Sequence, residues 1–310
     1  MSSRFLILLS VPLLAQKPWS PPLTPDGHPD LQGYWTNITI TPLERPADLG
    51  AKAFFTPQEA LQYEKKFREQ TNADRRDGGA QADVGRAYND FWYDRGTKVA
   101  SNLRTSLVVD PPDGHIPPLT PQASQRLAQR AAAAQGHQYD GLENRALSER
   151  CLLWATAGPP MLPSFYNNNY KIVQAPGYVM ILIEMIHDVR IIPTDGRPHL
   201  PSDVRQWLGD SRGHWEGGTL VVETTNFSDK NSFHGSDSQM KLIEKFTRTG
   251  PDTIMYEFTV QDPTAFTRDW TGQVPMSRTQ GPIIEYACHE GNYAMSGMLA
   301  GARADEKKKE

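Results

Sequence analysis

The second half of the chain alternates short apolar runs with tight turns, and no helix-forming stretch separates these runs. Ala175-Pro176-Gly177 and Thr249–Asp252 have the residues of tight turns, with an apolar run on either side. Runs this closely spaced are expected to pair antiparallel, because a parallel neighbour needs a long and usually helical crossover. The predicted strands lie within residues 170–192, 218–227, 241–262, 265–278 and 283–289. The pattern predicts a mainly β member of the α+β class, built on an antiparallel β-barrel or sandwich.

The region before these strands is rich in proline, which fixes φ and lacks a backbone N–H. Two helices are predicted within it. Thr56-Pro57 begins one over residues 56–70, and a second Thr-Pro pair begins the other over residues 121–134, since Thr caps a helix and Pro fits its first position. We therefore expect an irregular wrap with two helices around the β core.

Four segments follow from these patterns. They are a signal peptide in residues 1–15, a proline-rich region with two helices in 16–150, an antiparallel β core in 151–295, and a helix with a charged tail in 296–310.

The first residues have the composition of a secretory signal peptide. Arg4 precedes an apolar run from Phe5 to Leu14, and this run is too short for the ~20 residues of a membrane-spanning helix. An apolar N-terminal anchor is the alternative. We expect a periplasmic or secreted protein with no stable membrane span once the signal is removed.

Two cysteines, Cys151 and Cys288, permit one disulfide in an exported protein. The bond would close a long loop and add about 4 kcal/mol in the chain-entropy model. Two buried free thiols, or Cys288 as a metal ligand beside His289, are the alternatives.

Charge and motifs exclude several classes of function. The net charge of -4 gives no electrostatic footprint for nucleic acid. No glycine-rich phosphate loop follows a strand, and the spacings typical of zinc sites, such as HExxH or paired CxxC, do not occur. We therefore expect no cofactor and no metal, and the oligomeric state stays open.

Residues 188–227 are rich in aromatic and charged side chains, and about twenty-five of them form a loop that joins two predicted strands. Loops this long in compact domains are usually functional or disordered, and two Trp residues favour an ordered loop. We interpret it as a lid or rim over a pocket. The alternative is that the tryptophans are packing residues, which is their more common role, and that the arginines pair with nearby aspartates. The side chains singled out are Trp207, Asp210, Arg212, His214 and Trp215.

The preceding strand carries Glu184 in an apolar run, with Arg190 on the same face if the strand is regular. Burial raises the pKa of a carboxyl group and suits it to acid–base work, so we expect Glu184 to face the barrel interior within reach of a His. His187 is the nearest candidate, as a proton shuttle, a metal ligand or a surface group. A Glu184–Arg190 ion pair is the structural alternative.

Four further candidates lie in the last third of the chain. Trp270 could line the mouth of a barrel, and Glu285 and His289 share one face of the last predicted strand. At about 13 Å apart, the latter two are too distant to hold one metal. His234, in a polar loop, could lie at a rim or in solvent.

Four motifs resemble a large family of exported proteins from soil bacteria, notably acidobacteria, whose function is not established. The motifs are PLTPDGHPDLQGYW, EMIHDVRIIPTDGRPHLP, WLGDSRGHWEGGTLVVETTNF and YACHEGNY. The resemblance covers nearly the whole mature chain. It implies that the protein is exported, and it implies no mechanism. The strand pattern also resembles the calycin barrels, which bind small molecules.

Three functions are compatible with these features. The first is an exported β-barrel enzyme that acts on a small, partly apolar molecule by acid–base chemistry, as an isomerase, lyase or hydrolase. Glu184, His187, Asp210 and His214 would be catalytic, and Arg190, Trp207, Arg212, Trp215, Trp270, Glu285 and His289 would bind the ligand. The second is a non-catalytic small-molecule-binding protein, with few titratable groups in its pocket. The third is a structural envelope protein without a pocket.

Overall fold

The computed structural model describes residues 19–85 and 89–308, apart from the side chains of residues 83–85 and of His187. The predicted signal peptide lies outside the described residues. Within them, no helix is long and apolar enough to cross a membrane.

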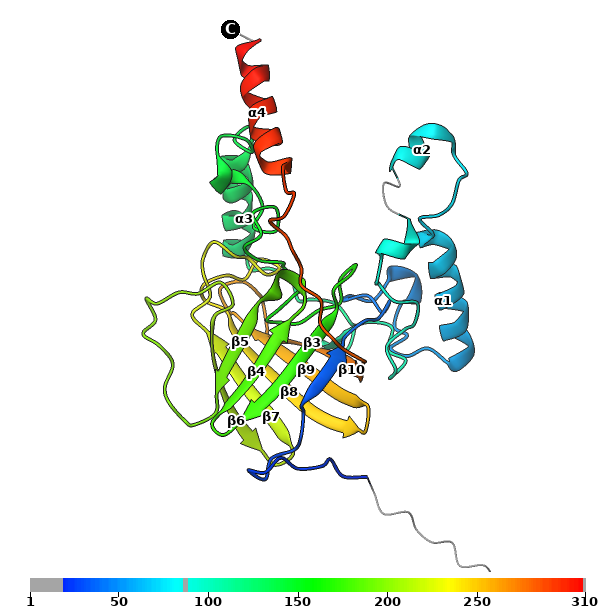
Figure 1. Ribbon diagram of the computed structural model, residues 1–310, viewed down its shortest axis with the longest axis vertical. Coiled ribbons are helices and arrows are strands. Elements are labelled where there is room, and N and C mark those ends of the chain that lie inside the picture. Colours follow the sequence, from blue (N-terminus) through cyan, green and yellow to red (C-terminus); the bar gives the residue numbers. More distant parts are fainter. Residues whose placement is uncertain (1–18, 86–88, 309–310) are drawn as a thin grey trace, which may run out of the picture.

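Antiparallel strands dominate the described chain and curl into a nearly closed barrel, as the sequence predicted (Figure 1). Nine strands follow one another in the order β5-β4-β3-β1-β10-β9-β8-β7-β6, and β2 pairs with β10 beside them. The strands are β1 (Gly33–Thr36), β2 (Val108–Asp110), β3 (Asn169–Ala175), β4 (Tyr178–Ile183), β5 (Val189–Pro193), β6 (Asp210–Glu216), β7 (Thr219–Thr225), β8 (Lys241–Gly250), β9 (Thr253–Gln261) and β10 (Trp270–Arg278).

The two ends of this order, β5 and β6, lie next to each other without pairing as a ladder in the described residues. Gly213 of β6 lies so close to Ile192 of β5 that an added Cβ would come within 2.9 Å of the isoleucine side chain. The barrel is therefore closed at this seam by side-chain packing.

Side chains fill the inside of the barrel. Buried and less buried residues alternate along β8 and β9, because successive side chains of a strand point to opposite faces. Phe246, Tyr256 and Phe258 pack together in the interior, with Trp35 and Trp270 fully buried in the same core. Because these large side chains occupy the barrel interior, a ligand site is expected beside the barrel and not inside it.

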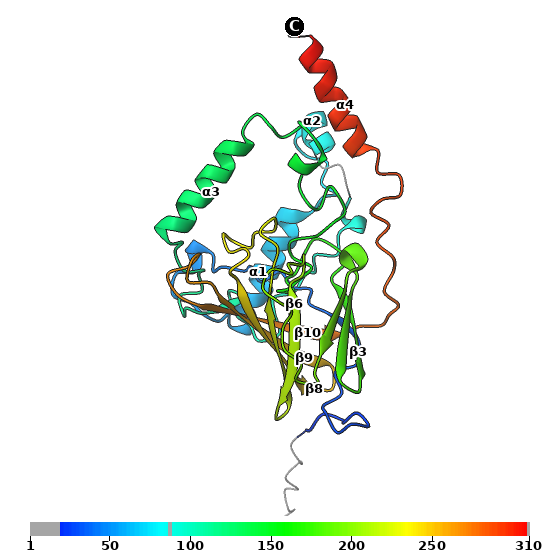
Figure 2. The same cartoon turned by 90° about the vertical axis from the view of Figure 1, so that its left-hand side faces the viewer.

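The helices stand around one end of the barrel. α3 and α4 lie beyond that end and α1 lies beside it (Figures 1 and 2). Thr56 caps α1 as predicted, because its hydroxyl accepts from the Glu59 backbone while the Glu59 carboxylate accepts from the Thr56 backbone. The helices are α1 (Pro57–Thr71), α2 (Gly79–Gly85), α3 (Pro121–Ala134) and α4 (Ala294–Lys307), with short 3-10 turns at Ala47–Leu49, Asp90–Trp92, Leu142–Asn144 and Met185–His187.

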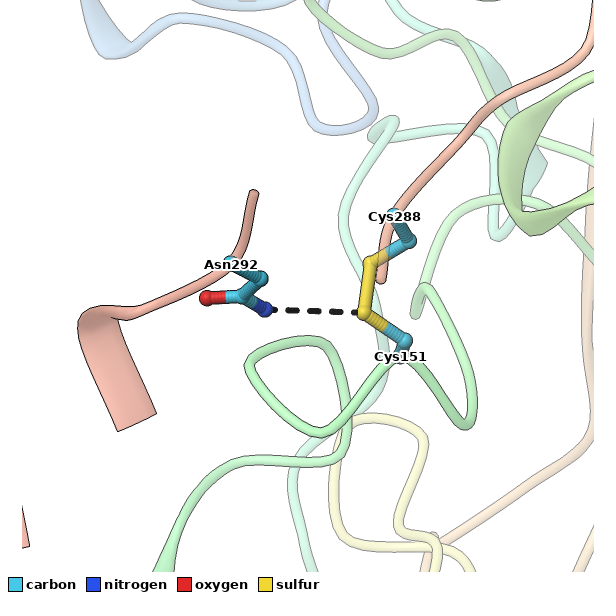
Figure 3. The surroundings of a disulfide bond; sticks show 3 residues. All are labelled: Cys151, Cys288 and Asn292. Atoms are coloured by element: carbon cyan, nitrogen blue, oxygen red, sulfur yellow. Dashed lines mark hydrogen bonds between the residues drawn. A yellow bond between two sulfur atoms is a disulfide. The ribbon is translucent and has the colours of Figure 1, made fainter. Parts of the chain in front are cut away.

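An extended segment, residues 279–293, leads from β10 to α4 (Figures 1 and 2). A disulfide between Cys151 and Cys288 ties it to the chain before β3, with Asn292 beside the sulfur of Cys151 (Figure 3). The predicted disulfide is therefore present. The predicted strand over residues 283–289 is wrong, because these residues run outside the sheet.

A second correction concerns the predicted loop between residues 194 and 216. Its last part, Asp210–Glu216, is strand β6, which forms a hairpin with β7 through Gly217-Gly218. The loop is accordingly residues 194–209 only. Asp210, Arg212 and His214 lie on a barrel strand and not on a lid.

Candidate functional site

A cavity with a mainly apolar lining lies beside the barrel, between the main core and a smaller hydrophobic cluster. Its volume is about 620 Å³. Leu107 and Phe233 belong to the main core, whereas Ile40 and Phe67 belong to the cluster that joins α1 to the N-terminal segment. The lining comes from residues 39–43, α1, Arg95, Leu107, residues 154–156, residues 162–165 and residues 232–234. Its size and chemistry are those of a site for a small organic molecule.

Most polar groups around this cavity already have partners within the protein. Thr39 and Thr41 donate to the carbonyls of Lys98 and Arg104, at 3.1 and 3.4 Å. Arg95 pairs with Asp90 at 2.9 Å and stacks on Tyr93. The cavity therefore offers a ligand mainly apolar contacts and no unpaired charge from Arg95.

Trp154 forms one aromatic wall of the cavity. Its indole N–H donates to the Ser164 hydroxyl at 3.1 Å, and its ring packs at a tilt against Tyr166. The hydrogen bond fixes the plane of the indole. The wall is thus preformed and does not need the ligand to position it.

His234 occupies the tip of a two-residue turn at the edge of the cavity. Phe233 and Ser236 exchange backbone hydrogen bonds of 2.8 and 3.0 Å across it, and φ is 51° at His234 and 100° at Gly235. Positive φ is uncommon for a residue with a side chain, and such strain is often found at functional positions. Loss of hydration lowers the pKa of the His234 imidazole. This effect is larger than that of the Glu44 charge, which raises the same pKa.

Glu184 lies at the end of β4 and is buried, as expected for an acid–base group. Its carboxylate accepts from the Asn169 side chain at 2.8 Å and from the Ile284 backbone at 3.4 Å. The chain leaves the strand there, with φ of 59° at Ile186, so Glu184 and Arg190 do not share the face of one regular strand. The side chain of His187 lies outside the described residues.

Arg190 is buried inside the barrel and makes an ion pair with Glu244 of β8. One guanidinium nitrogen lies 2.9 Å from a Glu244 oxygen, and another donates to Ser211 at 3.3 Å. Tyr256 donates to the same carboxylate at 2.8 Å. The structural alternative of a Glu184–Arg190 pair is therefore wrong, since the described partner of Arg190 is Glu244.

Asp210 fixes the loop of residues 194–209 onto the barrel. Its buried carboxylate accepts from His199 at 2.8 Å, from the Leu200 backbone at 3.0 Å and from Arg212 at 2.6 Å. The other nitrogen of His199 lies 3.4 Å from Glu223. These contacts hold a loop in place, and His199 is the partner that the sequence did not single out.

The proposed catalytic residues do not gather at one point. Asp210 and His214 stand four residues apart on β6, about 13 Å at the rise of a strand. His214 is exposed and contacts Glu216 at 2.8 Å. The hypothesis of one shared proton-transfer site thus finds no support in the positions of Asp210 and His214.

The proposed ligand-binding residues are also scattered. Trp215 stacks on His28 with ring centroids 4.7 Å apart, and Trp270 is fully buried among Phe233, Phe258 and Phe266. Glu285 and His289 are exposed on the segment leading to α4. Three of the predicted site residues, Trp207, Arg190 and Asp210, line a common cavity of about 560 Å³ at the seam between β5 and β6.

No cluster of three or more His, Cys, Asp or Glu side chains suited to a metal ion occurs in the described part of the chain. The apolar cavity of about 620 Å³ was missed by sequence reasoning because its walls come from seven separate segments of the chain. The only local signal was His234 followed by Gly235 in a polar loop, which predicts a tight turn and nothing more.

Comparison with protein-family models, with curated proteins and with solved structures gave no match. The family resemblance of the four sequence motifs therefore stays a prediction, and the function has to be argued from the site itself.

Proposed function

We propose that this barrel protein binds a small, mainly apolar organic molecule in the 620 Å³ cavity beside its core. The single observation that carries the proposal is a preformed cavity of ligand size with aromatic walls and few titratable groups. Such a lining is what the hypothesis of a non-catalytic binding protein requires. A structural protein would need no cavity of this kind.

The chemistry of the walls defines the class of ligand. Apolar side chains provide most of the contact, and burial of apolar surface contributes roughly 25 cal/mol per Å². Arg95, the cation among the lining residues, is already paired with Asp90. A charged ligand would have to give up its hydration without gaining a free counter-ion, so an uncharged molecule is favoured.

Titration with N-phenyl-1-naphthylamine, an uncharged dye that fluoresces in apolar surroundings, tests this function. Ala155 lines the cavity, and Ala155→Trp should fill part of it and weaken dye binding at least tenfold. The matched control is Ala304→Trp on α4, a helix without buried residues, which should bind like the wild type. Equal binding by wild type and Ala155→Trp, with both folded by thermal unfolding, would rule out this cavity.

Acid–base catalysis is a second candidate, and one observation favours it. Loss of hydration and repulsion from the Glu184 carboxylate both raise the pKa of Asp94. Asp94 lines a groove of about 510 Å³ that shares Phe67, Thr71 and Arg95 with the apolar cavity. Recovery of a bound ligand in chemically altered form would show that the protein is an enzyme and not only a binding protein.

Export to the periplasm or beyond belongs to the same proposal. The disulfide between Cys151 and Cys288 supports it, because such bonds persist in oxidising compartments. The signal-like first residues and the resemblance to exported proteins point the same way. Fractionation of cells that express the full chain would locate the protein.

A further inference from the structure

Residues 279–293, which we call the strap, run outside the sheet from β10 to α4 (Figures 1 and 2). Much of the strap is exposed, including Ile284 at 71% and Tyr293 at 81%. Tyr286 and Cys288, in contrast, are partly buried and pack against the main core. The strap therefore contacts the main core through these two side chains.

Stacked rings connect Tyr286 to the wall of the apolar cavity. Tyr286 stacks on Tyr166 with ring centroids 6.2 Å apart, and Tyr166 packs against Trp154 at a centroid distance of 6.1 Å. Trp154 lines the cavity, whereas Tyr166 and Tyr286 do not. An effect of Tyr286 on a ligand must therefore pass through the position of Trp154.

The disulfide ties the same two parts of the chain together covalently. Cys288 lies two residues after Tyr286, and its partner Cys151 lies three residues before Trp154. Asn292 of the strap donates from its amide to the Cys151 sulfur at 3.8 Å (Figure 3). The strap is thus joined to the cavity wall both through the S–S bond and through the stacked rings.

The contacts that precede Tyr286 on the strap are weaker than the disulfide. The Ile284 N–H donates to the Glu184 carboxylate at 3.4 Å, which is long for a hydrogen bond. Gly281 lies against the ring of Tyr34, so that an added Cβ would come within 2.5 Å of it. These contacts set the path of the strap, and the covalent bond holds Tyr286 in place.

We infer that the strap positions the aromatic wall of the ligand cavity, with Tyr286 as the positioning residue, and that opening of the Cys151–Cys288 disulfide weakens ligand binding. The inference rests on the proposed function, because it assigns a control element to the same cavity. A dithiol opens the bond by thiol–disulfide exchange, in which both cysteines become thiols and the dithiol closes to a cyclic disulfide. Tyr286 is then free to leave Tyr166, and Trp154 loses the support of the rings beside it.

Titration with N-phenyl-1-naphthylamine measures the effect of Tyr286. Tyr286→Ala keeps the disulfide and removes the ring, and should weaken dye binding about 2- to 10-fold, which corresponds to the loss of one aromatic pair. Tyr286→Phe keeps the ring and should bind the dye like the wild type. The matched control is Tyr293→Ala, which removes an exposed ring from the same strap and should leave the affinity unchanged.

Opening of the disulfide should have at least the same effect as Tyr286→Ala. Dithiothreitol should weaken dye binding by the wild type. Cys151→Ser/Cys288→Ser should bind the dye as weakly as the reduced wild type, whether or not dithiothreitol is present. Circular dichroism at the temperature of the titration checks that each form is folded.

The surroundings of Trp154 can be followed before any ligand is added. In protein labelled with fluorotryptophan, the fluorine NMR signal of Trp154 is assigned by its absence from Trp154→Phe. This signal should shift in Tyr286→Ala and on reduction of the wild type, and should stay in place in Tyr293→Ala. The signal of Trp270, which is fully buried in the core, should not move, because a change confined to the strap does not reach it.

The outcomes separate the inference from the function on which it rests. Weaker dye binding in Tyr286→Ala and on reduction, together with a shifted Trp154 signal, supports the inference. Unchanged dye affinity in either form, or an unmoved Trp154 signal, overturns it, while weaker binding by Ala155→Trp keeps the cavity as the site. Equal dye binding by the wild type and Ala155→Trp overturns both.

Discussion

Single residues show where the sequence was informative and where it was not. Glu184 was expected to be buried because of its apolar neighbours, and it is. Trp270 was expected to be able to line a barrel mouth, yet it is fully buried. The face that a side chain occupies follows from strand register, and register depends on partners far along the chain.

The Arg190–Glu244 pair leads to a prediction at this scale. Glu244→Gln leaves the buried guanidinium without a counter-charge and should lower the free energy of unfolding by about 3–5 kcal/mol. The double variant Arg190→Met/Glu244→Gln removes both charges and should recover part of the loss. Denaturant unfolding of the two single variants and the double variant measures this coupling; additive losses would contradict a direct pair.

At the scale of elements, local signals predicted the helices and most strands. The Thr-Pro starts gave α1 and α3, and the Pro-Gly turn gave the β3–β4 hairpin. Strand β6 was missed because its sequence, DSRGHWE, is polar and contains a glycine. Its conformation comes from pairing with β7, a tertiary effect that overrides low strand propensity.

The clamp formed by Asp210 can be tested on the loop that it holds. Asp210→Asn replaces an acceptor by an amide donor that faces His199, Leu200 and Arg212, and should loosen residues 194–209. Amide hydrogen exchange in this loop should accelerate at least tenfold while the barrel strands keep their protection. Glu216→Gln, at the exposed end of the same strand, is the control. Unchanged exchange would show that the loop is held by other contacts.

For the whole molecule, the mainly β barrel was predicted correctly, whereas the candidate site was not. Fold class follows from periodicity along the chain, which is local information. The cavity arises from segments as distant as residues 39–43 and 232–234, and no local pattern records that they meet. Of the residues predicted for a lid, Asp210 and Arg212 instead help to fix the loop of residues 194–209, and Trp215 packs against the core.

The disulfide acts at this scale, because Cys151 and Cys288 enclose every strand from β3 to β10. A cross-link over 137 residues restricts the unfolded chain, and for this loop length the chain-entropy model gives about 5 kcal/mol. Cys151→Ser/Cys288→Ser should lower the free energy of unfolding by that amount. The denaturation midpoint should then shift to a correspondingly lower denaturant concentration. Adding a thiol reductant to the wild type should reproduce the shift, and an unchanged midpoint would show that the bond adds no global stability.

The position of β1 has a consequence for how the protein is made. Residues 33–36 lie between β3 and β10, with Trp35 opposite Arg278. A nascent chain therefore cannot complete the barrel until residue 278 has left the ribosome, because one edge of β1 can pair with β3 earlier while its other edge waits for β10. Such long-range pairing slows folding. For a polypeptide that crosses a membrane as an open chain, this delay would keep the molecule threadable until it reaches the far side.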